Sequence, residues 1–147
     1  MILNGKHTLP ASPKVIWDLM MNPEVLARIT PGITRLEPAG DDIFKTIAEI
    51  KVGPVGGAFT GTLKVADKKE PESFALVVQQ NSRIGNAQAV MNMMLEPAED
   101  GAATNISFQG DVKLSGMMAT MGQRVLTPVA SMLSGQFFEA LKKELPG

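Results

Sequence analysis

The chain has 147 residues, of which 44% are hydrophobic and 20% are charged, and its formal net charge is −1. This size and balance predict one globular domain, residues 1–147, with a single substantial core, and the scattered lysines and arginines exclude the concentrated basic surface that nucleic-acid binding needs. The absence of cysteine and the single histidine exclude disulfides, thiolate metal sites and histidine-rich metal sites.

The first part of the chain predicts a strand followed by two short helices. Residues 2–9 form the strand, which Pro10 ends. Ser12 is placed to cap a helix whose first position is Pro13, where the missing N–H costs nothing. Asn22-Pro23 ends this helix and starts a second one, and Thr30-Pro31-Gly32 stops the second helix sharply.

From Ile33 the hydrophobic pattern changes to a period of two, which is typical of strands with one wet face. The predicted strands are joined by short turns without crossover helices, so they form an antiparallel meander. Several positions on the apolar face carry glycine or alanine, which allow bending or close approach. The clearest strands cover residues 44–52, 58–66, 73–82, 86–96 and 103–114.

After Ser115-Gly116 the period returns to 3.6, which predicts one long C-terminal helix. Pro128 lies inside this segment, and we expect it to kink or divide the helix because it removes a backbone hydrogen bond. The apolar stripe of the helix is rich in methionine and phenylalanine. It consists of Met117, Met121, Val125, Val129, Met132, Leu133, Phe137 and Leu141.

This order of elements predicts an α+β fold in which a curved antiparallel sheet wraps around the long C-terminal helix. The sheet has one apolar face to cover, and the helix is the only sizeable cover. Small inward residues leave the gap incompletely filled, so we expect a cavity for an apolar molecule; ordinary core packing is the alternative for each side chain. The candidate ligand-binding residues are Trp17, Ile50, Phe59, Met91, Met93, Phe108, Met121, Val125, Leu133 and Phe137.

The sequence shows no catalytic constellation. His7 is the only histidine, and no Ser-His-Asp or Cys-His set exists. The Gly53–Gly57 turn lacks the Lys-Ser/Thr pair that a phosphate-binding loop requires. We therefore predict that the protein is not an enzyme and holds no metal.

Several short motifs, taken in their order and spacing, resemble the CoxG family of carbon monoxide dehydrogenase subunits. This family belongs to the START-like (SRPBCC, polyketide cyclase-like) superfamily, and the resemblance implies its helix-grip, or Bet v 1-like, fold. At one position the chain departs from many members, since Thr30 stands where they carry a cysteine. The motifs are Gly5, Ala11-Ser12-Pro13, Val15 with Trp17, Asn22-Pro23, Pro31-Gly32, Val52-Gly53-Pro54-Val55, Phe59 with Gly61, Gly116, Gly122 with Arg124, and Phe137-Phe138.

The resemblance implies a non-catalytic binder of a lipid or quinone, accessory to a molybdenum hydroxylase of the carbon monoxide dehydrogenase type. No cofactor is expected apart from such a bound molecule. The N-terminus lacks the apolar region of a signal peptide, and no apolar run is long enough to span a membrane. We therefore expect a cytoplasmic protein, and the resemblance implies peripheral contact at the inner face of the membrane. Two alternatives stay open: a cyclase or aromatase-like enzyme of the same fold, and a protein-interaction module whose core is full.

Overall fold

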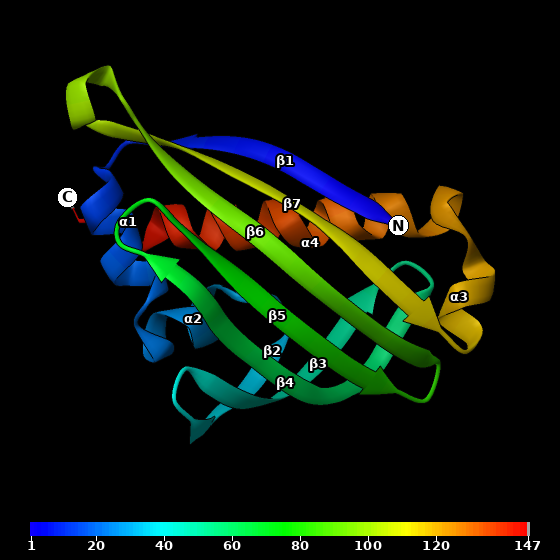
Figure 1. Ribbon diagram of the computed structural model, residues 1–147. Coiled ribbons are helices and arrows are strands. Elements are labelled where there is room, and N and C mark those ends of the chain that lie inside the picture. Colours follow the sequence, from blue (N-terminus) through cyan, green and yellow to red (C-terminus); the bar gives the residue numbers. More distant parts are fainter. Residues whose placement is uncertain (147) are drawn as a thin grey trace.

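The computed structural model describes residues 1–146. One curved sheet covers a long C-terminal helix, and two short helices pack at one end of the molecule (Figure 1). The elements in chain order are β1 (Ile2–Leu9), α1 (Pro13–Met20), α2 (Pro23–Ile29), β2 (Ile33–Gly40), β3 (Ile43–Val52), β4 (Val55–Lys69), β5 (Ser73–Ser82), β6 (Gly85–Ala98), the single-turn η1 (Glu99–Gly101), β7 (Ala103–Ser115), α3 (Met117–Met121) and α4 (Gln123–Lys143).

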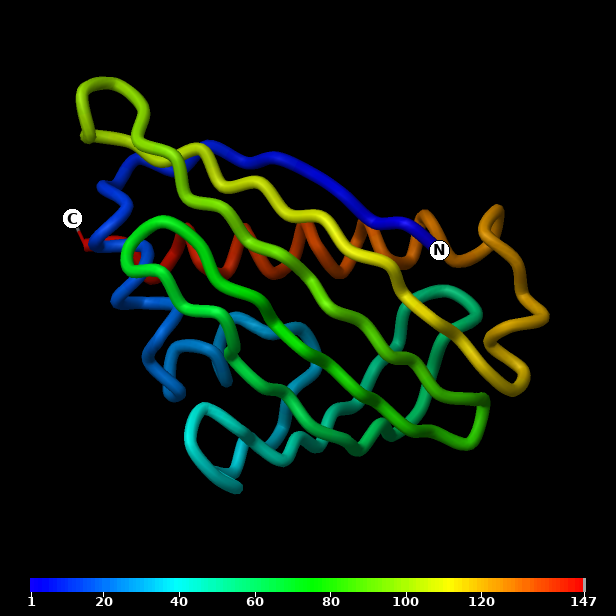
Figure 2. The backbone as a smooth tube through the Cα atoms, in the orientation of Figure 1, coloured from blue at the N-terminus to red at the C-terminus, as the bar shows by residue number. Residues whose placement is uncertain are grey.

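The seven strands form one antiparallel sheet in the order β1-β7-β6-β5-β4-β3-β2. Strands β2 to β7 are the predicted meander, and its last strand, β7, pairs with β1, the first strand of the chain. The backbone trace in Figure 2 shows how the hairpins curl together around α4. This is the helix-grip arrangement that the sequence predicts, and it leaves the concave face of the sheet turned toward one helix.

Glycine lets the sheet bend around the helix at the middle of β4. Gly61 lies on the concave face, between Thr46 of β3 and Gln80 of β5. A Cβ atom at this position would collide with the carbonyl oxygen of Gln79. Only glycine fits such a close approach of two backbones, so this position contributes to the curvature that forms the concave face.

The C-terminal helical segment differs from the single stripe expected from the sequence. Gly122 separates α3 from α4, and its φ of 79° and ψ of 163° are not helical. The two helices therefore have independent phases. Helix α4 is not divided at Pro128 but continues to Lys143. The expected stripe residues Met117 and Met132 are more than half exposed, at 59% and 54%.

The two short N-terminal helices end where the sequence predicts and carry the main core. The Ser12 hydroxyl accepts a hydrogen bond from the Val15 amide at 3.3 Å, and Asn22 caps α2 through a bond from the Glu24 amide. Both caps satisfy amides that the first helical turn leaves free. The inward faces of α1 and α2 are fully buried against the sheet and the last turns of α4. The most buried side chains there are Ile16, Met20, Leu26, Ile29, Ile106 and Leu141.

Candidate functional site

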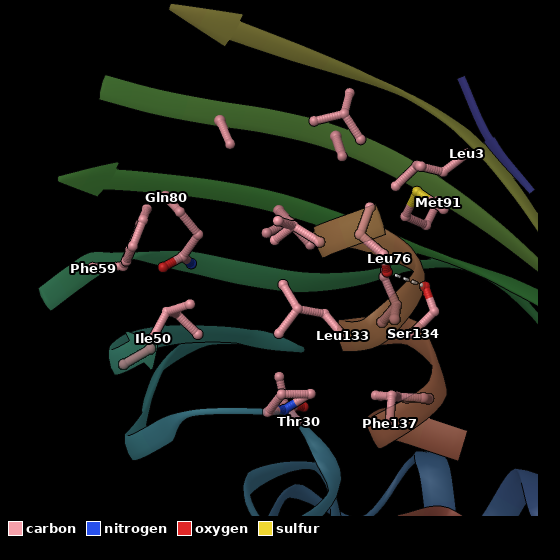
Figure 3. A pocket seen from close by; sticks show the side chains of 18 of the residues that line it. Leu3, Thr30, Ile50, Phe59, Leu76, Gln80, Met91, Leu133, Ser134 and Phe137 are labelled. Atoms are coloured by element: carbon pink, nitrogen blue, oxygen red, sulfur yellow. Dashed lines mark hydrogen bonds between the residues drawn. The ribbon is translucent and has the colours of Figure 1, made fainter. Parts of the chain in front are cut away.

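A cavity of about 400 Å³ lies between the concave face of the sheet and α4. It opens to the surface and is not filled by protein side chains. Pockets that bind small molecules have volumes of about 300–1,000 Å³. Figure 3 shows side chains of β3 to β6 on one side of the space and Leu133, Ser134 and Phe137 of α4 on the other. The volume is therefore large enough for a small organic molecule.

Most of the predicted ligand-binding residues line this cavity. Five of them come from the sheet, where the period-two alternation directs them to the concave face. The other two come from the part of α4 that faces the sheet. They are Ile50 of β3, Phe59 of β4, Met91 and Met93 of β6, Phe108 of β7, and Leu133 and Phe137 of α4.

Three predicted residues lie outside the cavity lining. Trp17 is 4% exposed and packs edge-to-face against Phe74, with ring centroids 5.6 Å apart, so it is part of the core beneath α1. Met121 is the last residue of α3, and Val125 is 38% exposed on the first turn of α4. The prediction misplaced these two because it assumed one continuous apolar stripe through Gly122. The break at Gly122 turns Leu126 and Val129 inward instead.

Aromatic rings close one end of the cavity. Phe138 stacks on Phe108 with centroids 5.6 Å apart and meets Phe137 edge-to-face at 5.2 Å. Phe138 also stacks on His7 of β1 at 4.0 Å, and the His7 ring stacks near Phe108 with centroids 6.3 Å apart. Aromatic pairs at such distances add about 0.5–1.5 kcal/mol beyond the burial of their area. This cluster fixes the position of α4 on β1 and β7 and gives the cavity a rigid end.

Two of the polar side chains in the lining form hydrogen bonds within their own helical segments. The Thr30 hydroxyl donates to the carbonyl of Leu26 at 2.7 Å, and the Ser134 hydroxyl donates to the carbonyl of Ala130 at 2.9 Å. The proton of each hydroxyl is therefore already used, and only the hydroxyl oxygens remain available as acceptors.

Two further polar residues of the lining, Thr46 and Gln80, lie on the sheet and bond to each other. They were not among the ligand-binding residues predicted from the sequence. The Gln80 amide donates a hydrogen bond from Nε2 to the Thr46 hydroxyl at 2.8 Å, and both residues line the cavity. The sequence does carry a signal for them. Thr46 is in phase with Phe44 and Ala48, and Gln80 continues the inward alternation of β5, so each is a polar residue on an apolar face.

No lining side chain carries a formal charge. The amino group of the lining residue Met1 is already paired, with the Asp111 carboxylate at 3.0 Å and the Val112 carbonyl at 2.9 Å. His7 lies against Phe138 and is not part of the lining, and Arg83 is exposed in the turn between β5 and β6. The converging histidine, arginine and acid that would favour a cyclase-like enzyme are therefore not present in this cavity.

Residues 1–146 contain no group of three potential metal ligands among histidine and the acidic side chains.

None of the helices within residues 1–146 has both the length and the hydropathy needed to cross a bilayer.

Comparisons with known proteins agree with the fold described above. A conserved protein from Geobacillus kaustophilus superposes with a TM-score of 0.94 at 28% identity, over 98% of this chain and 94% of that one. The Zhui aromatase/cyclase from Streptomyces sp. R1128 gives 0.71 at 13% identity, over 98% and 92%. Ara h 8.0201 gives 0.65 at 16% identity, over 97% and 95%.

At these identities the cyclase and Ara h 8.0201 are similar to the chain in fold only, and the fold they share is the helix grip. No curated protein sequence matches the chain. The family model for CoxG, a carbon monoxide dehydrogenase subunit, matches residues 5–146, nearly the whole chain. The protein therefore belongs to the CoxG family of carbon monoxide dehydrogenase subunits and has the START-like, helix-grip fold of its superfamily.

Proposed function

We propose that this protein binds an apolar small molecule, a lipid or a quinone, in the cavity between the sheet and α4. The observation that carries the proposal is an unfilled space of about 400 Å³ whose walls are almost entirely apolar. Transfer of apolar surface out of water contributes about 25 cal/mol per Å². A ligand that fills the cavity gains this energy without displacing packed side chains.

The proposed role is binding rather than catalysis. Proton transfer requires a titratable group within hydrogen-bonding reach of the reacting atom. The lining consists of aliphatic, aromatic, methionine, threonine, serine and glutamine residues, whose side chains supply no such group near neutral pH. The cavity walls are suited to holding a molecule and shielding it from water.

The family name supports an accessory role beside a molybdenum hydroxylase of the carbon monoxide dehydrogenase type. In this role the protein would carry its ligand to or from that enzyme at the inner face of the membrane. A pull-down with the tagged protein from cells that express such a hydroxylase tests the partner. Recovery of the hydroxylase is the expected result, and its absence under conditions where the enzyme is abundant would contradict the partnership.

Ligand binding is tested by native mass spectrometry and by organic extraction of the purified protein. We expect a neutral lipid or quinone at about one molecule per chain. Ala89 of β6 lines the cavity between Val78 and Val112, so Ala89→Phe should fill the space and abolish the bound mass. Gln88→Phe places the same ring on the exposed outer face of β6 and should leave the ligand in place.

The binding proposal would be wrong if the wild-type protein, offered lipids and quinones, bound none of them. It would also be wrong if Ala89→Phe bound them as well as Gln88→Phe does.

A further inference from the structure

The polar pair on the concave face is built across three neighbouring strands. Thr46 of β3 is opposite Gly61 of β4, and Gly61 is opposite Gln80 of β5. Because Gly61 has no side chain, the Gln80 amide reaches across it and donates to the Thr46 hydroxyl at 2.8 Å. Thr46 is only 3% exposed. The pair is therefore held in place within the apolar wall.

This pair keeps hydrogen-bonding capacity that residues 1–146 do not use. The glutamine amide has a second N–H and an acceptor oxygen, and the threonine hydroxyl keeps its own proton. The bond from Gln80 to Thr46 is the one side-chain hydrogen bond that either residue makes with the described chain. Polar groups on a surface that becomes dry are costly unless they are paired. A ligand that fills the cavity must therefore offer them a partner.

We propose that Thr46 and Gln80 form the anchor that recognises an uncharged oxygen on the bound molecule. This inference rests on the proposed function, the binding of an apolar ligand in the same cavity. No lining side chain is cationic, and the Met1 ammonium is already paired with Asp111, so a carboxylate or a phosphate finds no free counter-charge there. The structure therefore selects a neutral molecule with a carbonyl or hydroxyl oxygen on an apolar body, and it rejects fatty acids and charged phospholipids.

The chemistry of the amide extends this selection to two redox states of one ligand. The free N–H of Gln80 donates to a carbonyl oxygen, and its Oε1 accepts from a hydroxyl. A quinone presents carbonyl oxygens, and the corresponding quinol presents hydroxyl groups. The anchor can bind both forms, as a carrier between two redox partners would need. Fixed donors alone would favour the quinone.

The test compares probes that share one ring system. Menadione carries two carbonyl oxygens, 2-methylnaphthalene carries none, and 2-naphthoate carries a carboxylate. The dissociation constants are measured by calorimetry for the wild type, Thr46→Val and Gln80→Leu. Each variant should bind menadione about three- to tenfold more weakly relative to 2-methylnaphthalene, which is the effect of about one lost hydrogen bond. The wild type should bind 2-naphthoate more weakly than menadione.

Two variants act as controls. Gln79→Leu makes the same change as Gln80→Leu at the neighbouring position on the exposed outer face of β5, so the ratio of the two affinities should not change. Thr46→Ser keeps the hydroxyl and should restore the wild-type ratio. If a variant folds poorly, infrared spectroscopy of menadione bound to the wild type gives a second reading. A hydrogen-bonded carbonyl absorbs at lower wavenumber than the same carbonyl in an alkane.

The anchor is overturned if Thr46→Val and Gln80→Leu keep the wild-type affinity ratio, or if the bound carbonyl absorbs as it does in an alkane. Tight binding of 2-naphthoate would overturn the selection of neutral ligands. In each case binding of 2-methylnaphthalene would still support the proposed apolar site. If the wild type binds neither menadione nor 2-methylnaphthalene, the site and its anchor both fail.

Discussion

Leu133 and Leu141 lie on the same helix but face different surroundings. Leu141 is 0% exposed and packs in the main core, whereas Leu133 lines the cavity. Truncation of a packed leucine removes its contacts and leaves a new void, at a cost of about 3–5 kcal/mol. Truncation of a leucine beside an existing space removes fewer contacts and creates less new void.

We therefore expect Leu141→Ala to lower the free energy of unfolding by about 3–5 kcal/mol and Leu133→Ala by about 1–2 kcal/mol. Urea denaturation of both variants measures the difference. Equal losses at the two positions would show that the space beside Leu133 is filled by protein in solution.

At the scale of single residues, the sequence predicts the sheet part of the site better than the helix part. Alternation places Met91 and Phe108 on the inner face without further information. Trp17 could not be assigned in the same way, because a large aromatic on a short helix packs equally well in a core or a pocket. Thr46 and Gln80 can be recognised in the sequence as polar residues on an apolar face, but only the structure shows that they pair with each other beside an unfilled space.

At the scale of elements, Gly122 determines which residues of α4 face the sheet. Its φ of 79° and ψ of 163° lie in a region that is essentially restricted to glycine. Gly135 is the matched control, because it lies inside α4 and a Cβ there would meet no atom within 4 Å.

We expect Gly122→Ala to destabilise the protein by about 1–3 kcal/mol through backbone strain, and Gly135→Ala to stabilise it by about 0.5–1 kcal/mol. Thermal and urea denaturation report both effects. Similar effects of the two alanines would mean that α3 and α4 form one continuous helix in solution.

The end of α4 is tied to α2 by an ion pair. Arg28 donates to the Glu144 carboxylate from Nη2 at 2.5 Å and from Nε at 3.1 Å. The hydrogen bond from Arg28, together with its charge, lowers the pKa of Glu144 below its ordinary value of 4.5. A lowered pKa in the folded state means that the contribution to stability is complete above about pH 4.5 and is lost as the pH falls through the folded value.

The stability difference between wild type and Glu144→Gln should therefore be constant from pH 7 to about pH 5 and shrink in more acidic solution. Because the pair is solvated, the difference is expected to be small. Glu139→Gln, at an exposed position of α4, is the control. A difference that grows on acidification would contradict the assigned direction of the pKa shift.

Among the elements, the strands could be predicted closely because each turn is marked by glycine, proline or charge, as in the agreement for residues 73–82. The helical phase could not be predicted in the same way. A period of 3.6 fits one stripe that runs through Gly122 about as well as it fits two separate stripes, one before and one after this residue. Pro128 was expected to kink or divide the helix, and α4 is not divided there. Pro128 removes only one hydrogen bond, and the sheet packed against α4 stabilises the rest.

At the scale of the whole molecule, the fold combines a well-packed end with an unfilled middle. Helices α1 and α2, the last turns of α4 and the neighbouring sheet form the packed end. The cavity between the middle of α4 and the sheet lacks the contacts that a full core would supply. This division predicts that the protein gains stability when the space is filled, either by a ligand or by a larger side chain.

A ligand that binds only the folded state stabilises it by RT ln(1 + [L]/Kd), which is about 1.4 kcal/mol at about ten times Kd. For a domain of this length that gain raises Tm by about 3–6 °C. Menadione at about ten times its Kd should produce this shift in the wild type and in Gln88→Phe, as measured by calorimetric scans. Ala89→Phe should melt at or above the wild-type Tm without ligand, because its ring occupies the space, and menadione should shift it no further. An equal shift in Ala89→Phe would place the bound molecule outside the cavity, because Ala89→Phe fills the space between α4 and the sheet and Gln88→Phe leaves it open.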